Sequence, residues 1–241
     1  MTSAATKPTE KWVADKGAIF PYGYDSGGRL SNELGVTGIP HAFLVNPGGK
    51  IVWQGHPARL DDATIEKHLD GALTRPLYSW PAAAGKVKKA FLKGDFAGAL
   101  DAAGKLAKDD PFGEEVAGIV RGVLEGRLAT YAAALEKGDV LTAYAGYKAL
   151  SKGLKGMDEE ATVKDGLKTI SKDKQLKAIL KTQEKLADIL VEAGEVRRRK
   201  DCDAVIDALE KLLKKNEDGF VGSEIRARIK DMREKKGQLA R

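Results

Sequence analysis

The residues with the clearest chemical meaning surround a single proline. Gly38, Ile39 and Pro40 come directly before an apolar run that begins at His41 and ends at Asn46. An Ile–Pro bond can adopt the cis form at small cost, and a tight turn there would expose the backbone of Ile39. Pro40 has no N–H, which keeps that edge free for an incoming chain. Backbone exposed in this way could pair with an extended chain in the manner of strand addition.

Dithiol redox chemistry needs a pair of cysteines, which this sequence lacks. Its one cysteine, Cys202, lies far downstream between Asp201 and Asp203. Acidic neighbours disfavour the reactive thiolate, so we interpret Cys202 as a small, half-buried helix residue. A single cysteine also excludes an intramolecular disulfide. No residue is predicted to be catalytic.

Two other groups of residues could bind metals or phosphates. The three histidines, His41, His56 and His68, are predicted on a strand, in a turn and on a helix. Their spacing is not that of a metal site, so no metal and no cofactor are predicted. The run 197–200 (Arg-Arg-Arg-Lys) could contact phosphates, but acidic residues flank it and stacking aromatics are absent. A solvated helix face is the preferred interpretation, and no nucleic-acid partner is expected.

Short elements surround the Ile39–Pro40 stretch. The pattern predicts a helix over 8–17, an edge strand over 18–25, and a brief helix with Leu30 and Leu34 that Gly35 closes. A hairpin follows, in which Pro47-Gly48-Gly49 joins strands 41–46 and 50–55. Asp61 or Asp62 can then cap a helix. The residues expected to line one face of this helix are Ile65, Leu69, Ala72 and Leu73.

The rest of the chain has a helical pattern. Residues 76–81 (Pro-Leu-Tyr-Ser-Trp-Pro) break the preceding pattern and are predicted to be a linker. Beyond 82, alanine, leucine, lysine and glutamate dominate, and strand signals vanish. The predicted helices are 83–93, 96–108, 112–136, 139–152, 158–171, 174–193, 196–215 and 219–237.

A weak internal repeat links two of these helix pairs. Residues 90–95 (Ala-Phe-Leu-Lys-Gly-Asp) align with residues 134–139 (Ala-Leu-Glu-Lys-Gly-Asp). A Lys-Gly-Asp junction between amphipathic helices resembles tetratricopeptide-like hairpins. Two similar hairpins in an irregular bundle would explain the same pattern, and both interpretations stay open.

Composition limits the broad class. The chain has 241 residues, of which 42% are hydrophobic and 32% charged, typical of one large or two ordinary globular domains. The net charge of +6 comes entirely from residues downstream of Arg75, because the first 75 residues are balanced. No apolar run reaches the ~18 residues of a membrane span. With Met1 as the true start, no apolar leader precedes the chain and the expected location is cytoplasmic.

The region from Trp12 to Leu73 resembles the C-terminal half of a thioredoxin-like domain of the TlpA or redoxin type. The matching features are Trp12-Val13, Pro21-Tyr22 leading to Asp25, Leu34-Gly35-Val36, the Gly-Ile-Pro turn, and the hairpin that ends at Gly55-His56-Pro57. This family performs thiol-disulfide exchange, and its cis-proline faces the active-site cysteines. The resemblance therefore implies a cis bond at Pro40 and a substrate-binding role for Ile39 and Pro40, which would bind an extended peptide. The resemblance implies an α+β fold: an incomplete thioredoxin-like α/β module at 8–75, the linker at 76–81, and an all-α region at 82–241.

The resemblance stops short of the family's chemistry. No Cys-x-x-Cys precedes Pro40, and no other side chain replaces a thiolate in disulfide exchange. Three explanations stay open: the true start lies upstream, the module is a remnant supported by the helical region, or a partner chain completes its sheet. An upstream signal peptide would give a periplasmic or other extracytoplasmic location. The alternative function is a helical-repeat scaffold that binds protein partners.

Overall fold

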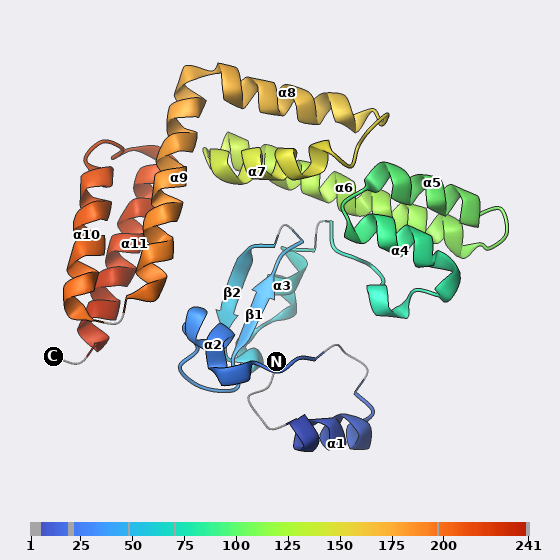
Figure 1. Cartoon of the computed structure of the whole chain (residues 1–241), viewed down its shortest axis with the longest axis horizontal. Helices are drawn as coiled ribbons and strands as arrows, with labels where there is room; N and C mark the ends of the chain where they lie inside the picture. Colours follow the sequence, from blue (N-terminus) through green and yellow to red (C-terminus); the bar gives the residue numbers. More distant parts are fainter. Residues whose placement is uncertain (1–5, 19–21, 48, 70, 197, 240–241) are drawn as a thin grey trace. The chain divides into compact units, whose positions relative to one another are not determined.

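The structure, a computed structural model, describes residues 6–18, 22–47, 49–69, 71–196 and 198–239 (Figure 1). These residues are mostly helical and contain one small antiparallel sheet of two strands, so the α+β class with a helical region is confirmed. The chain forms two compact units. The N-terminal unit comprises residues 1–44 and 51–65, and the helical unit comprises residues 45–50 and 66–241.

The N-terminal part of the chain contains short elements close to those predicted. They are α1 (Thr6–Lys16), α2 (Arg29–Glu33), β1 (Ala42–Val45), β2 (Ile51–Gly55) and α3 (Asp62–Glu66). Part of the predicted edge strand, residues 19–21, lies outside the described residues, and Tyr24 forms an isolated β-bridge. Asn46 fixes the hairpin turn, because its N–H donates to the Lys50 carbonyl oxygen at 2.9 Å and its side chain accepts from the Lys50 N–H.

Helix α3 is shorter than predicted. It begins as expected, with the Asp61 carboxylate accepting from the Thr64 N–H at 2.7 Å, but it ends at Glu66 instead of continuing to Leu73. Gly71 adopts a left-handed φ of 74°, and a Cβ there would lie 2.8 Å from the Cα of Gly126. Leu73 packs against the core of the helical unit. Residues 67–73 therefore do not continue α3, and Gly71 and Leu73 instead pack against the helical unit.

The N-terminal unit has no buried core among its described residues. Each of them is exposed or only partly buried, and Trp12, Tyr22, Tyr24 and Ile39 are exposed apolar side chains. Burial of apolar surface is the main favourable term in folding. This unit therefore draws less stability from its own packing than the rest of the chain does.

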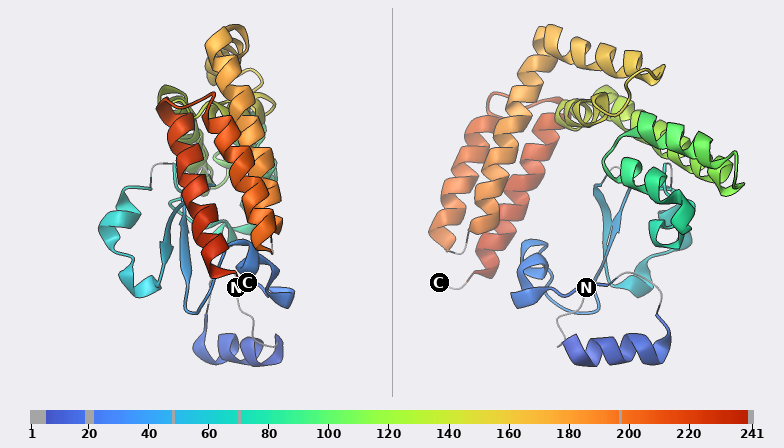
Figure 2. Two further views of the ribbon diagram at one scale, coloured as in Figure 1. Left: turned by 90° about the vertical axis from the view of Figure 1, so that its left-hand side faces the viewer. Right: turned by 45° about the vertical axis from the view of Figure 1, so that its right-hand side comes forward.

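The helical unit reproduces the predicted helix order. Its helices are α4 (Gly85–Leu92), α5 (Phe96–Leu106), α6 (Phe112–Glu136), α7 (Val140–Ser151), α8 (Glu159–Lys172), α9 (Lys174–Glu195), α10 (Arg199–Leu213) and α11 (Gly219–Gln238). Successive helices from α4 to α8 pack against one another, and α9, α10 and α11 lie side by side as a three-helix group (Figure 2).

Two hydrophobic clusters hold these helices together. The first runs from Trp80 to Leu180 and joins α4–α8 to the start of α9, and the second joins the rest of α9 to α10 and α11. Ile179 of α9 contacts both clusters, so α9 connects them. Trp80, in the segment predicted as a linker, is buried in the first cluster, and Leu77 packs beside it.

The two Lys-Gly-Asp junctions have the same geometry. Gly94 and Gly138 take left-handed φ values of 74° and 85°, where a side chain would be strained. The N–H groups of Asp95 and Asp139 donate to the carbonyl oxygens of Ala90 and Ala134 at 3.1 and 2.8 Å. Each aspartate then caps the following helix. The sequence repeat thus marks two equivalent helix hairpins, α4–α5 and α6–α7.

Candidate functional site

The candidate peptide site is the segment between α2 and β1. Asp25 holds the start of α2, the helix that precedes this segment. Its carboxylate accepts hydrogen bonds from the N–H groups of Leu30 and Ser31 at 3.0 and 2.9 Å, and from the Ser31 hydroxyl at 2.6 Å. The Ser31 hydroxyl, followed by the two N–H groups, lowers the pKa of the Asp25 carboxyl. Asp25 therefore stays ionised and holds the first turn of α2 in place.

Helix α2 ends in a turn that directs the chain toward Pro40. Gly35 takes a left-handed φ of 67°, and the Val36 N–H donates to the Ser31 carbonyl oxygen at 2.8 Å. This closing turn is the one that the Leu34-Gly35 pattern predicted. Helix α2 ends at Glu33, and residues 38–40, which follow the turn, belong to no helix or strand.

The segment 38–40 is open to an incoming chain. The Ile39–Pro40 bond is cis, as the sequence indicated. The Ile39 side chain is 86% exposed, and no hydrogen bond joins the backbone of residues 38–40 to any other described residue. Backbone N–H and carbonyl groups are strong hydrogen-bonding groups. Those of Ile39 can therefore pair with an extended peptide without first breaking a hydrogen bond inside the protein.

His41 follows Pro40 and has a property that sequence reasoning missed. Its ring lies 4.8 Å from that of Phe43, and its Nε2 atom is buried without a hydrogen-bond partner among the described residues. A histidine beside an apolar strand could have drawn attention in the sequence, but only the fold shows that its outer nitrogen is enclosed.

The other two histidines occupy unrelated positions. His56 caps a short 3₁₀ helix, where its Nδ1 accepts from the Ala58 N–H at 3.2 Å. The prediction that His68 lies on a helix was wrong, because α3 ends two residues earlier, at Glu66, and His68 lies in a turn. Within the described part of the chain, no three His, Cys, Asp or Glu side chains gather where a metal could bind.

Cys202 is more deeply buried than predicted. Its exposed fraction is 0%, in the cluster between α9, α10 and α11, so packing of the whole three-helix group encloses it. Of the basic run, Arg197 lies outside the described residues. Arg198 donates two hydrogen bonds of 2.8 Å to the Asp201 carboxylate, and this pairing lowers the pKa of Asp201. Cys202 and Arg198 belong to the helical unit, whereas Ile39 and Pro40 belong to the N-terminal unit.

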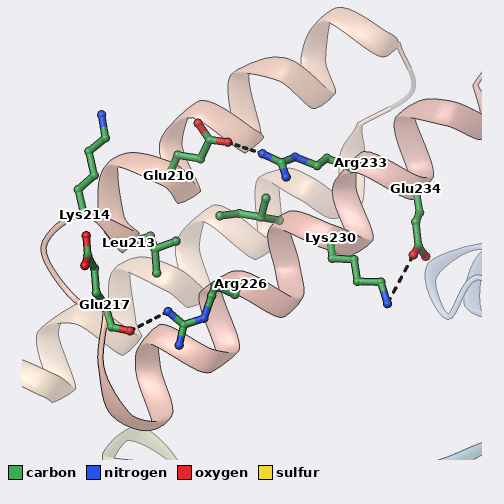
Figure 3. A pocket seen from close by; sticks show the side chains of 9 residues that line it. Glu210, Leu213, Lys214, Glu217, Arg226, Lys230, Arg233 and Glu234 are labelled. Carbon is green, nitrogen blue, oxygen red and sulfur yellow. Dashed lines mark hydrogen bonds and ion pairs between the residues drawn. The ribbon is translucent and has the colours of Figure 1, made fainter.

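A shallow groove of about 760 Å³ lies between α10 and α11 (Figure 3). Leu213 and Ile229 are the apolar residues in its lining; the charged ones are Glu210, Lys214, Glu217, Arg226, Lys230, Arg233 and Glu234. Arg233 pairs with Glu210 at 2.7 Å, and Arg226 donates to the Glu217 carbonyl oxygen at 2.7 Å. The lining residues recur at helical spacing, a signal present in the sequence. The lining contains acidic and basic side chains, some of which pair with one another. The charge of the groove therefore does not indicate one class of ligand.

A second hollow, of about 500 Å³, lies at the α6–α7 junction. Small residues of α6, among them Gly126, Ala129 and Ala133, leave this space open, and Asp139 at its edge accepts a hydrogen bond from Lys50 Nζ. Gln183 of α9 supports the junction, because it accepts from the Leu141 N–H at 2.8 Å and donates to the Gly138 carbonyl oxygen at 3.0 Å. Sequence periodicity could not reveal this contact between distant segments.

Comparison of the chain with protein-family models, with curated proteins and with solved structures gave no match. Among the helices in the described part of the chain, none combines the length and the apolar character that crossing a membrane requires.

Proposed function

We propose that residues 8–75 are a thioredoxin-like module of the TlpA or redoxin type, and that its Ile39–Pro40 segment binds extended polypeptide. The carrying observation is the open segment itself: Ile39 is 86% exposed, and the backbone of residues 38–40 has no hydrogen bond to another described residue. The order of elements supports the family proposal, because a capped helix, the Gly-Ile-Pro turn, a β-hairpin and a further capped helix follow one another as in that family.

Binding would use the backbone more than side chains. An extended peptide beside Ile39 can exchange N–H and carbonyl hydrogen bonds with it in the manner of strand addition. The exposed Ile39 side chain adds an apolar contact, which favours peptides with alternating apolar residues. The proposed role is therefore recognition of unfolded or extended protein segments.

Thiol-disulfide exchange remains the role of the family, and we do not assign it to a side chain of these residues. The sequence has no Cys-x-x-Cys, and Cys202 is fully buried in the helical unit. We expect no reduction of insulin by dithiothreitol above the uncatalysed rate when this chain is added. Turnover that disappears in a Cys202→Ser variant would overturn this part of the proposal.

Peptide binding is tested with labelled ten-residue peptides of alternating apolar and polar residues. In a titration followed by nuclear magnetic resonance, the amide signals of residues 38–42 should shift first. Ile39→Asp should weaken binding by about tenfold or more, because it places a charge at the centre of the contact. The matched control is Ile51→Asp, which changes an exposed isoleucine of β2 and should alter affinity less than about twofold. Equal losses in both variants would contradict the site.

A second proposed function concerns the helical unit, which we infer to be a scaffold for protein partners. The observation that favours it is the equivalence of the α4–α5 and α6–α7 junctions, since stacked helix hairpins present extended binding surfaces. The hollow beside Ala129 and Ala133 is one such surface.

This scaffold role is tested by photo-crosslinking in the whole chain. A photoreactive residue at Ala129, in the hollow, should crosslink a protein from cell extract. The same residue at Ala161, an exposed alanine of α8, is the control and should not crosslink that protein. Identical products from both positions would contradict a specific surface on α6.

A further inference from the structure

Helix α9 carries charges that oppose ordinary helix electrostatics. Its first turn has no acidic residue and its last turn has no basic one. Lys174 and Lys177 lie at the N-terminal end, whereas Asp188 and Glu192 lie toward the C-terminal end. Within the helix, the dipole favours the reverse order, with anions first and cations last. Its two ends are compensated, because the N-cap Asp173 accepts from the N–H groups of Gln175 and Leu176 and Lys235 Nζ donates to the Ala193 carbonyl oxygen at 2.9 Å. The neighbouring α8 follows the usual rule, with Glu159 and Glu160 in its first turn and Lys172 in its last.

The lysines of α9 also repel one another. Lys177, Lys181 and Lys185 are spaced by four residues, so they form one row along the helix, and like charges at this spacing are destabilising. All three are exposed, and none has an ion pair with another described residue. This row of like charges therefore breaks a local rule on an exposed face. Such violations are expected at functional or strained sites.

The opposite face of α9 fixes the position of this row. Leu180 and Gln183 are buried, and α9 contributes to both hydrophobic clusters. The helix cannot rotate to hide its lysines without losing these contacts. Gln183 also forms hydrogen bonds with the α6–α7 junction. The lysine row therefore lies on a helix that is held by contacts with its neighbours.

We propose that the row Lys177, Lys181 and Lys185, extended by Lys174, binds an acidic helical segment of a partner protein. The three lysines span about 12 Å along the axis, which matches carboxylates at four-residue spacing on a partner helix. The exposed face has no arginine to grip phosphates in a bidentate manner and no aromatic ring to stack on bases. Its exposed apolar residues, Ala178 and Val191, do not form the apolar face that membrane insertion requires. This proposal rests on α9 and is independent of the Ile39–Pro40 site.

The test uses the whole chain and a synthetic helical peptide with glutamates at every fourth position, followed by fluorescence anisotropy. The triple variant Lys177→Gln, Lys181→Gln and Lys185→Gln should weaken binding by about tenfold or more. Added salt should weaken binding of the unaltered chain, because the charges are exposed. A peptide with glutamine in place of glutamate should not bind.

The matched control removes three exposed lysines of the α4 region: Lys86→Gln, Lys89→Gln and Lys93→Gln. It changes the net charge equally and should alter affinity less than about twofold. The α9 triple variant should also melt at the same or a slightly higher temperature, because repulsion is relieved; this separates lost binding from misfolding. Equal losses in the two triple variants would overturn the proposal, as would tighter binding of anionic vesicles or single-stranded DNA through the same lysines. Self-association through α9 in place of peptide binding would overturn it as well.

Discussion

The two units of this chain differ in what holds them together. The helical unit contains both hydrophobic clusters, its helices pack closely against one another, and aspartate side chains cap α5, α7 and α9. The N-terminal unit has no buried residue among those described, and its order comes from local hydrogen bonds such as those accepted by Asp25. Because stability follows buried apolar area, we infer that the helical unit carries most of the stability, while the N-terminal unit carries the segment that we propose binds peptide.

The largest expected effect is in the core of the helical unit. Phe96 is fully buried at the start of α5, with its ring 5.9 Å from that of Phe91. Phe96→Ala should lower the free energy of unfolding by about 3–5 kcal/mol, because it removes a large side chain and leaves a cavity. Chemical denaturation followed by circular dichroism measures it.

The control for this substitution is nearby. Leu92 is 63% exposed at the end of α4, and Leu92→Ala should change stability by no more than about 0.5 kcal/mol. Similar losses at both positions would mean that the core assigned to the helical unit does not dominate its stability.

A smaller effect is expected where the two equivalent hairpins meet. The Gly153 carbonyl oxygen accepts from the Ala97 N–H at 2.9 Å, and a Cβ at Gly153 would overlap the Gly94 carbonyl oxygen. Gly153→Ala should therefore destabilise the chain by about 1–3 kcal/mol. The comparison is Gly104→Ala within α5, where a Cβ meets no atom; it should stabilise by about 0.5–1 kcal/mol. Thermal melts that show the same sign for both would refute this packing.

The helices were predictable because their signals are local. Asp95 and Asp139 cap helices, Gly94 and Gly138 end the preceding ones, and the apolar spacing between these points is helical. The turn at Gly35 was also visible as a short motif, whereas the cis bond at Pro40 was expected only from the family resemblance. A few adjacent residues determine each of these features.

Other features depend on contacts between distant residues and could not be predicted. The end of α3 is set by the approach of Gly71 to Gly126, and the burial of Trp80 by helices that follow it. The enclosed Nε2 of His41 and the clamp formed by Gln183 likewise require the folded arrangement. Whether Ile39 and Pro40 bind a peptide remains a prediction, because binding depends on a partner.

The smallest predicted effect concerns the Asp25 carboxylate in the N-terminal unit. The lowered pKa of Asp25 means that its carboxylate stabilises the start of α2 at neutral pH, and that this contribution is lost as the pH falls through the lowered value, below the ordinary 3.8. The amide signals of Leu30 and Ser31 should shift in that acidic range, and Asp25→Asn should abolish the transition. A transition above 3.8 would contradict the hydrogen bonds assigned to Asp25.

Hydrogen–deuterium exchange of the whole chain, with and without the alternating peptide, can show whether the Ile39–Pro40 segment is open and binds peptide. We expect slow exchange for core amides of α5, α6 and α10 in both states, and fast exchange for the amides of Gly38, Ile39 and His41 that slows when the peptide is bound. Slow exchange of the Gly38, Ile39 and His41 amides in the free chain, or no change there when the peptide is bound, would contradict the claim that this segment is an open binding site on a unit without its own core.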